Sequence, residues 1–172
     1  DITQEMVDQV KTEAAKRGLA NIRVAYAKAE ALPFEDASFD LVTCRIAPHH
    51  FDSIPDFLAE VHRVLKPGAA AAIADNVVPA GAVGDYINAF ERLRDPSHLR
   101  AWPMEEWRAA FAAARLSVAH EEAIDKTIEF KTWAARYDAI TKSLLLAMLA
   151  LAAPEVKAAL DPKGDGGTST FR

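Results

Sequence analysis

The sequence has little cysteine, no cluster of basic residues and no long hydrophobic run. Its one cysteine, Cys44, cannot form an intramolecular disulfide, which is typical of proteins in a reducing cytoplasm. The longest apolar run, 144–153, is shorter than the roughly 18 residues that indicate a membrane span. The formal net charge is −5, whereas a general nucleic-acid binder needs clustered lysine and arginine. We therefore expect a cytoplasmic protein that binds neither a membrane nor a nucleic acid.

Glycine is also scarce, and no glycine-rich loop lies between a strand pattern and a helix pattern. Such loops let a backbone approach a nucleotide-type cofactor closely, because glycine carries no Cβ. The glycines at 164, 166 and 167 have no strand before them and no helix after them. The sequence therefore lacks a recognisable loop of this kind.

The length and composition predict a single domain. The chain has 172 residues, and 51% of them are hydrophobic, which is enough to build a core. We interpret 1–172 as one domain, in which the helical segment 132–160 forms a cap or an interface.

The stretch 27–78 predicts a strand, a helix and a second strand in that order. An apolar run at 39–44 is typical of a strand that is covered on both faces. Ser53 then begins a capping box with Pro55 in the first helical turn, and Pro67-Gly68 ends the helix. A second apolar run follows at 69–78. This order is the building block of a parallel sheet, so we predict an α/β fold.

The remaining elements are expected from apolar periodicity and from their end signals. The expected helices are 3–18, 81–94, one beginning at Pro103, 133–151 with a break near Ser143, and 155–160. The expected strands are 22–26, 116–121 and 127–130, and 163–168 is expected to be flexible.

Several spaced motifs match one family in the same order: AEALPFEDASFDLVTC, then HHF, then RVLKPG. Together they resemble the second half of a class I S-adenosylmethionine-dependent methyltransferase, and most closely the small-molecule enzymes related to ubiquinone and menaquinone biosynthesis. The resemblance implies a Rossmann-like, mostly parallel sheet flanked by helices. It also implies S-adenosylmethionine as cofactor, S-adenosylhomocysteine as product, and methyl transfer to a small molecule.

The resemblance covers about two-thirds of such a domain, so we interpret the chain as a truncated form of the fold. Asp1 to Met6 resembles the stretch just after the second strand of the family, and the final strand is missing. The strand at 22–26 would then lack its usual neighbours. We expect it to pair directly with 39–44, or a second copy of the chain to form a homodimer by strand exchange or edge pairing.

The resemblance places the cofactor at the carboxyl ends of the strands. Asp1 would accept hydrogen bonds from the ribose hydroxyls, and the Ala29 backbone N–H would face the adenine ring. Lys28 lies where the family usually has an aspartate, and a lysine cannot accept a hydrogen bond from the adenine amino group. The residues assigned to the cofactor are Asp1, Met6, Lys28, Ala29, Glu30, Cys44 and Arg45. The alternatives are a frayed terminus for Asp1, a structural role for Glu30 and a buried thiol for Cys44.

The segment after the central strand is expected to face the methyl acceptor. His50, with Arg45, is the candidate catalytic residue, since a histidine can take a proton near neutral pH. The candidate pocket residues are His49, Asn76, Arg94 and His98. The alternative is that the histidine pair only caps its loop, and that 94–98 is a helix end followed by a turn. No further ligands are spaced to complete a metal site, so no metal is expected.

Two functions remain open from the sequence. The first is methyl transfer to a small molecule. The second is a methyltransferase-like domain without catalysis, which self-associates or binds a small apolar ligand. The intact 27–78 block favours the first, whereas Lys28 and the missing glycine loop favour the second.

Overall fold

The computed structural model describes residues 1–164, 170 and 171. These residues divide into two compact units. Unit 1 comprises Asp1–Arg45, Phe51–Ala74 and Ala110–Leu116, and unit 2 comprises Ile46–His50, Asp75–Ala109 and Ser117–Arg172. Each unit is described by itself.

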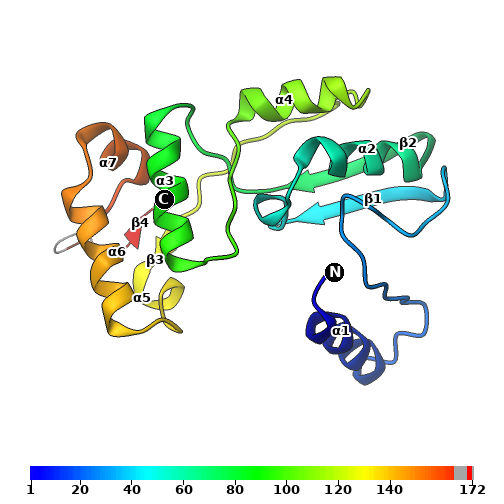
Figure 1. Cartoon of the computed structure of the whole chain (residues 1–172), viewed down its shortest axis with the longest axis horizontal. Helices are drawn as coiled ribbons and strands as arrows, with labels where there is room; N and C mark the ends of the chain where they lie inside the picture. Colours follow the sequence, from blue (N-terminus) through cyan, green and yellow to red (C-terminus); the bar gives the residue numbers. More distant parts are fainter. Residues whose placement is uncertain (165–169, 172) are drawn as a thin grey trace. The chain divides into compact units, whose positions relative to one another are not determined.

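Unit 1 is built on two parallel strands joined by a helix, as the sequence predicts (Figure 1). Strand β1 (Phe39–Arg45) pairs with β2 (Leu65–Ala74), so that Val42 lies opposite Ala71 and Arg45 opposite Ala74. Helix α2 (Ile54–Val64) connects them, and α1 (Gln4–Lys16) precedes β1. The parallel strand–helix–strand arrangement confirms the predicted α/β class.

The sequence of α2 explains both where it begins and which face it buries. The Ser53 hydroxyl accepts a hydrogen bond from the Asp56 backbone N–H at 3.2 Å, and Pro55 lies in the first turn. The residues that recur at helical spacing are the buried ones: Ile54, Phe57, Leu58, Val61 and Val64. A capped, amphipathic helix of this kind covers the two-stranded sheet.

The Ser53 cap gives a measurable contribution to stability. Ser53→Ala should lower the free energy of unfolding by about 1 kcal/mol, because one N–H of the first turn loses its partner. Thr3→Ala is the matched control, since Thr3 is the N-cap of α1 but its side chain makes no capping hydrogen bond. Urea titration of both variants measures the difference. Equal losses in the two variants would show that the Ser53 hydroxyl does not act as a cap.

Unit 2 is mostly helical. It contains η1 (Pro48–His50), α3 (Ala82–Arg94), α5 (Phe130–Trp133), α6 (Ala139–Leu151) and α7 (Pro154–Leu160). Helix α4 (Met104–Ala113) begins in unit 2 and ends in unit 1. Two short antiparallel strands, β3 (Ile128–Glu129) and β4 (Thr170–Phe171), complete it.

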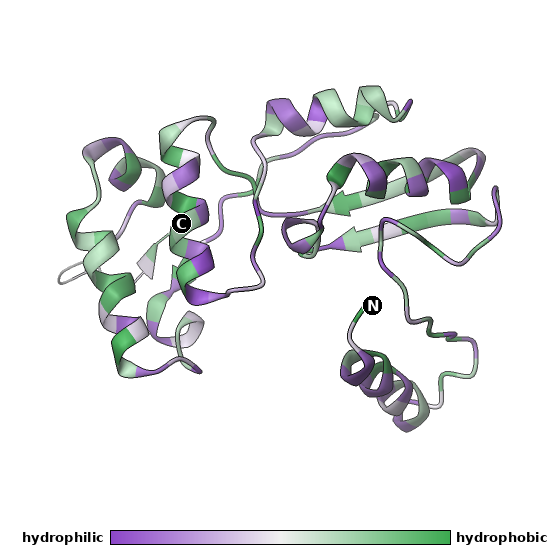
Figure 2. Ribbon diagram, viewed as in Figure 1, coloured by the Kyte–Doolittle hydropathy of each residue, from purple (hydrophilic) through white to green (hydrophobic). Residues whose placement is uncertain are grey.

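The core of unit 2 forms where α3, α6 and α7 meet. Phe90, Leu145 and Leu149 are at most 1% exposed, and the Tyr86 hydroxyl donates to the Met148 carbonyl at 2.8 Å. Helix α6 is hydrophobic along most of its length (Figure 2). Among the described residues no single helix is long and apolar enough to cross a membrane; α6 and α7 meet that criterion only together, as a pair bent by 115°. Helices α6 and α7 lie within 132–160, the segment expected to be a cap or an interface, whereas α3 does not.

The prediction of a strand at 22–26 is wrong. This segment has no ladder partner in unit 1, and the hydrogen bonds near its end go to Asp1 instead of β1. The Ala27 N–H donates to the Asp1 carbonyl at 3.0 Å, and the Asp1 amino group donates to the Ala25 carbonyl at 3.3 Å. The expected direct pairing with 39–44 is therefore wrong, whereas pairing with a second copy stays a prediction.

Other boundaries also differ from the expectation. No strand forms at 116–121, and the strand expected at 127–130 shrinks to β3. The helix expected at 133–151 breaks at residues 134–138, not near Ser143, because the Asp138 carboxylate caps α6 by accepting from the Thr141 N–H at 2.8 Å. Strand β2 begins at Leu65 and ends at Ala74, before the expected end at 78. Most of the segment expected to be flexible, 165–168, lies outside the described residues.

Candidate active site

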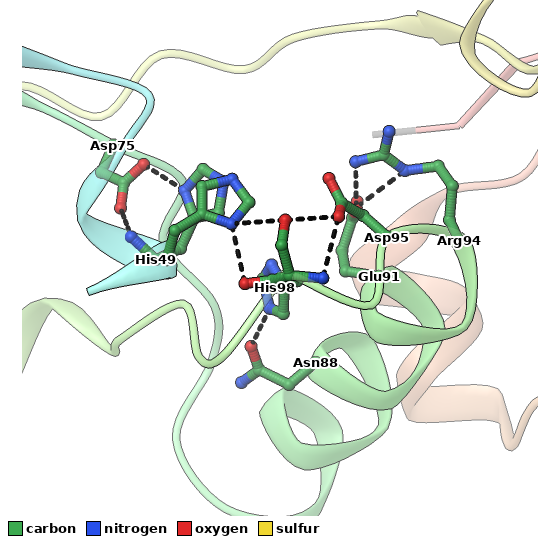
Figure 3. A network of polar contacts seen from close by, with 9 residues as sticks. His49, Asp75, Asn88, Glu91, Arg94, Asp95 and His98 are labelled. Carbon is green, nitrogen blue, oxygen red and sulfur yellow. Dashed lines mark hydrogen bonds and ion pairs between the residues drawn. The ribbon is translucent and has the colours of Figure 1, made fainter. Parts of the chain in front are cut away.

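Three histidine rings gather in unit 2 (Figure 3). His49 and His50 belong to η1, and His98 lies in the loop that follows α3. The ring centroids of His49 and His50 are 4.1 Å apart, and those of His49 and His98 are 5.3 Å apart. The structure therefore brings together three of the residues that the sequence nominated for the acceptor site.

His49 is held by a carboxylate that follows β2 directly. Its Nδ1 lies 2.6 Å from Asp75 Oδ1, and its backbone N–H donates to Asp75 Oδ2 at 2.8 Å (Figure 3). The two side chains are 6% and 3% exposed. A carboxylate accepts hydrogen bonds, so Nδ1 carries a proton, and in the neutral form of the ring the lone pair lies on Nε2.

His50 has a different kind of partner. Its Nδ1 lies 2.9 Å from the backbone carbonyl oxygen of Ser97 and 3.2 Å from the Ser97 hydroxyl. That hydroxyl donates to Asp95 Oδ1 at 2.6 Å, which also accepts from the Ser97 N–H at 3.0 Å. These hydrogen bonds lower the pKa of Asp95 against the opposing effect of its partial burial. His50 is thus the histidine that binds the backbone of a neighbouring loop.

His98 is the most buried of the three rings, at 2% exposed. Its Nε2 lies 2.8 Å from Asn88 Oδ1, which also accepts from the Ala101 N–H at 2.7 Å. The amide oxygen can only accept, so Nε2 of His98 carries the proton, the opposite tautomer to that of His49. The pKa of His98 is lowered to about 4 by its burial, which is the largest cause, together with the neighbouring His49, His50 and Arg92, while Asp95 opposes the shift.

The other two acceptor-site candidates, Arg94 and Asn76, make no hydrogen bond to the three histidines within the described residues. Arg94 pairs with Glu91 Oε2 at 2.9 Å, and its guanidinium lies 4.6 Å from the Trp133 ring centroid, so these two contacts engage it. Asn76 is exposed. The candidate pocket residues named from the sequence include Asn76 but neither Asp75 nor Asn88, yet Asp75 and Asn88 hold the two buried imidazoles. An aspartate placed directly after a strand is the signal that could have found Asp75.

In unit 1 the residues assigned to the nucleoside lie close to one another along two segments. Asp1 Oδ1 accepts from the Thr3 N–H at 2.8 Å, and residues 25–27 lie beside Asp1 through the backbone hydrogen bonds described above. Lys28 donates to Asp52 Oδ2 at 2.7 Å, which raises the pKa of Lys28. Glu30 accepts from the Ser53 N–H at 3.3 Å, which agrees with its structural alternative.

The other cofactor candidates are Met6, Cys44 and Arg45. Met6 is exposed on α1, and Cys44 is half-buried near the end of β1. Arg45 ends β1, is exposed, and forms no ion pair within the part of the chain that the structure describes. Across residues 1–164, 170 and 171, no group of three or more His, Cys, Asp or Glu side chains is arranged to hold a metal ion.

Comparison with known proteins explains this architecture. Residues 1–73 match the model of the methyltransferase domain family. The crystal structure of YcgJ from Bacillus subtilis superposes with a TM-score of 0.94 at 33% identity, covering 99% of this chain and 75% of that one. The chain belongs to the class I S-adenosylmethionine-dependent methyltransferases. Its Rossmann-like α/β class, read from the sequence, is thereby confirmed.

Other relatives of this methyltransferase chain agree. The curated YcgJ sequence, described as an uncharacterized methyltransferase, is 39% identical over 137 residues, which are 79% of this chain and 54% of YcgJ. YafE from Escherichia coli is 36% identical over 79% of this chain and 66% of its own length. UbiE from Brucella anthropi, a ubiquinone/menaquinone biosynthesis C-methyltransferase, is 45% identical over 69 residues, which are 40% of this chain and 26% of UbiE. The chain thus spans about half to two thirds of the first two curated relatives.

Proposed function

We propose that this chain forms part of an enzyme that transfers the methyl group of S-adenosylmethionine to a small molecule. The observation that carries the proposal is the parallel β1–α2–β2 unit, together with the likeness to YcgJ over almost the whole chain. In open parallel sheets, ligands bind at the carboxyl ends of the strands. In unit 1 those ends are Arg45 and Ala74, which lie opposite each other.

The residues of unit 1 fit the nucleoside half of the cofactor in part. Asp1 uses Oδ1 to accept from the Thr3 N–H and is exposed, so its second oxygen can accept from ribose hydroxyls. The Ala29 N–H has no hydrogen-bond acceptor among the described residues, and it can donate to a ring nitrogen. Lys28 does not fit as an acceptor for the adenine amino group, because an ammonium group only donates.

The cofactor, when bound, would supply an electrophilic methyl group on a sulfonium. The task of the chain is then to orient its ligands, and well-oriented reactants gain roughly 7–11 kcal/mol over reactants in solution. The competing proposal is a methyltransferase-like domain without catalysis. It draws support from Lys28, which lies at the position where the family usually has an aspartate and which is paired with Asp52.

Calorimetry with S-adenosylhomocysteine separates the two proposals. The 172-residue chain should bind it, and Asp1→Ala should weaken binding roughly 10- to 100-fold, because a hydrogen bond to a carboxylate contributes about 1.5–3 kcal/mol. Asp8→Ala is the matched control, since Asp8 is an exposed aspartate on α1 whose partners, Gln4 and Lys11, lie on the same helix. Absence of binding by the folded chain would favour the domain without catalysis. Equal weakening in both variants would exclude Asp1 as the ribose ligand.

A further inference from the structure

We infer that His49 accepts a proton from the methyl acceptor, that Asp75 is its positioning residue, and that the acceptor carries a weakly acidic hydroxyl group. This inference rests on the proposed function and names a residue and a substrate class for it. It differs from the expectation drawn from the sequence, in which His50 has this role. The observation behind it is the pair of hydrogen bonds that Asp75 makes to the ring and to the backbone of His49.

Asp75 fixes His49 in both orientation and tautomer. One carboxylate oxygen accepts from the ring at 2.6 Å and the other from the His49 N–H at 2.8 Å, so the ring and its own backbone are tied to one group. The His49 carbonyl is held as well, because it accepts from the N–H groups of Leu99 and Arg100 at 2.9 and 3.0 Å. In the neutral ring the lone pair therefore lies on Nε2, which has no hydrogen-bond partner among the described residues.

Nε2 of His49 is also within reach of solvent. In the described part of the chain, no fully buried side-chain nitrogen or oxygen lacks a hydrogen-bond partner. An unpartnered Nε2 on a ring that is 6% exposed must therefore be among the few atoms of this side chain that solvent touches. A basic nitrogen at the surface of an otherwise buried, fixed ring is suited to receive a proton from a ligand.

The other two rings are less suited to this role. The Nδ1 of His50 faces the carbonyl and the hydroxyl of Ser97, and the Asp95 carboxylate is joined to it only through that hydroxyl, whereas His49 is bonded to its carboxylate directly. His98 is 2% exposed, and its surroundings favour the neutral ring. Only His49 combines a buried carboxylate with an accessible nitrogen among these three rings.

The proton step balances without a further reactant. The O–H bond of the acceptor breaks and leaves its electron pair on the oxygen, and a new N–H bond forms at Nε2 of His49. The resulting imidazolium lies against the Asp75 carboxylate, which compensates its positive charge. The proton is later released to water. A histidine is matched to this exchange near neutral pH, which is why we name a weakly acidic hydroxyl.

The first test is nuclear magnetic resonance of the ¹⁵N-labelled 172-residue chain at pH 7, using long-range correlations in the histidine rings. His49 should carry its proton on Nδ1 and His98 on Nε2, so the two buried rings serve as opposite references in one spectrum. A His49 ring that carries its proton on Nε2 would overturn the inference, because its accessible nitrogen could then accept nothing. This arm uses the unaltered chain and does not depend on whether a variant folds.

The second test adds 4-nitrophenol, with nitrobenzene as the matched probe that lacks the hydroxyl. The His49 signals should move toward those of the imidazolium with 4-nitrophenol only. Asp75→Asn should weaken 4-nitrophenol binding at least tenfold, about 1.4 kcal/mol, and leave nitrobenzene binding unchanged, because a neutral amide cannot compensate the imidazolium. A purely structural role for Asp75 would weaken both probes alike.

The outcomes separate this inference from the proposed function. If S-adenosylhomocysteine binds but 4-nitrophenol leaves the His49 signals unchanged, the inference is wrong and the proposed function stands. If His49 responds to 4-nitrophenol but the chain does not bind the cofactor, the proposed function fails, while the proton-accepting pair is retained.

Discussion

Phe90→Ala should lower the free energy of unfolding of unit 2 by about 3–5 kcal/mol. Phe90 is 0% exposed, stacks on Trp133 with the ring centroids 5.2 Å apart, and meets Phe171 edge-on at 5.6 Å. Truncation removes the buried area and both ring contacts, and it leaves a cavity between α3 and the elements packed against it. Since whole domains are stable by only about 5–15 kcal/mol, a loss of this size is a large fraction of the total.

Chemical denaturation followed by circular dichroism and by tryptophan fluorescence measures this loss. Leu151→Ala is the matched control, because Leu151 belongs to the same unit but is 84% exposed. The free energy of unfolding of this variant should change by no more than about 0.5 kcal/mol. If the midpoints of the two variants moved by the same amount, Phe90 would not be the centre of the core. The helical unit would then owe its stability to other contacts.

The second large effect is a loss of stability in acid that depends on His98. Its pKa is lowered to about 4 in the folded chain, against an ordinary value of 6.5, so between these values the unfolded chain binds the extra proton. The neutral His98 ring makes its full contribution to the free energy of unfolding above pH 6.5, and this contribution is lost as the pH falls from 6.5 toward 4. Its full size is about 3 kcal/mol, at 1.36 kcal/mol for each pKa unit.

His98→Gln isolates this contribution, because a glutamine can still donate to Asn88 Oδ1 but does not titrate. Urea unfolding at a series of pH values from 7 to 4 should show a steeper fall for the original chain than for the variant. The carboxylates and the other histidines are common to both proteins, so their effects cancel in the difference. Parallel curves would mean that His98 is protonated as readily in the folded chain as in the unfolded one.

The sequence predicted those elements whose signals are local. Ser53, Pro55 and the periodic apolar residues of α2 specify a capped amphipathic helix without reference to the rest of the chain, and the structure confirms it. The prediction of a strand at 22–26 was wrong because alternation of apolar and polar residues is not enough to form a strand. A strand also needs a neighbouring strand to pair with, and this segment has none in unit 1.

The candidate site was only partly predictable for the same reason. His49, His50 and His98 could be nominated by their position after a strand or a helix. Which side chain holds each buried histidine depends on contacts across 26 residues, from His49 to Asp75, and across 10 residues, from His98 to Asn88. No periodicity in the sequence encodes such contacts, so the sequence favoured His50 although His49 is the ring bonded to a carboxylate.

The Asn88 side-chain amide joins α3 to the loop at Ala101 by a pair of hydrogen bonds, as the backbone groups of neighbouring strands do. It accepts from the N–H of Ala101 and donates to the carbonyl of the same residue, at 2.7 and 3.1 Å. The loop so attached also donates to the His49 carbonyl through Leu99 and Arg100. One continuous series of hydrogen bonds thus joins α3, through Asn88 and residues 99–101, to the residue proposed to receive the proton.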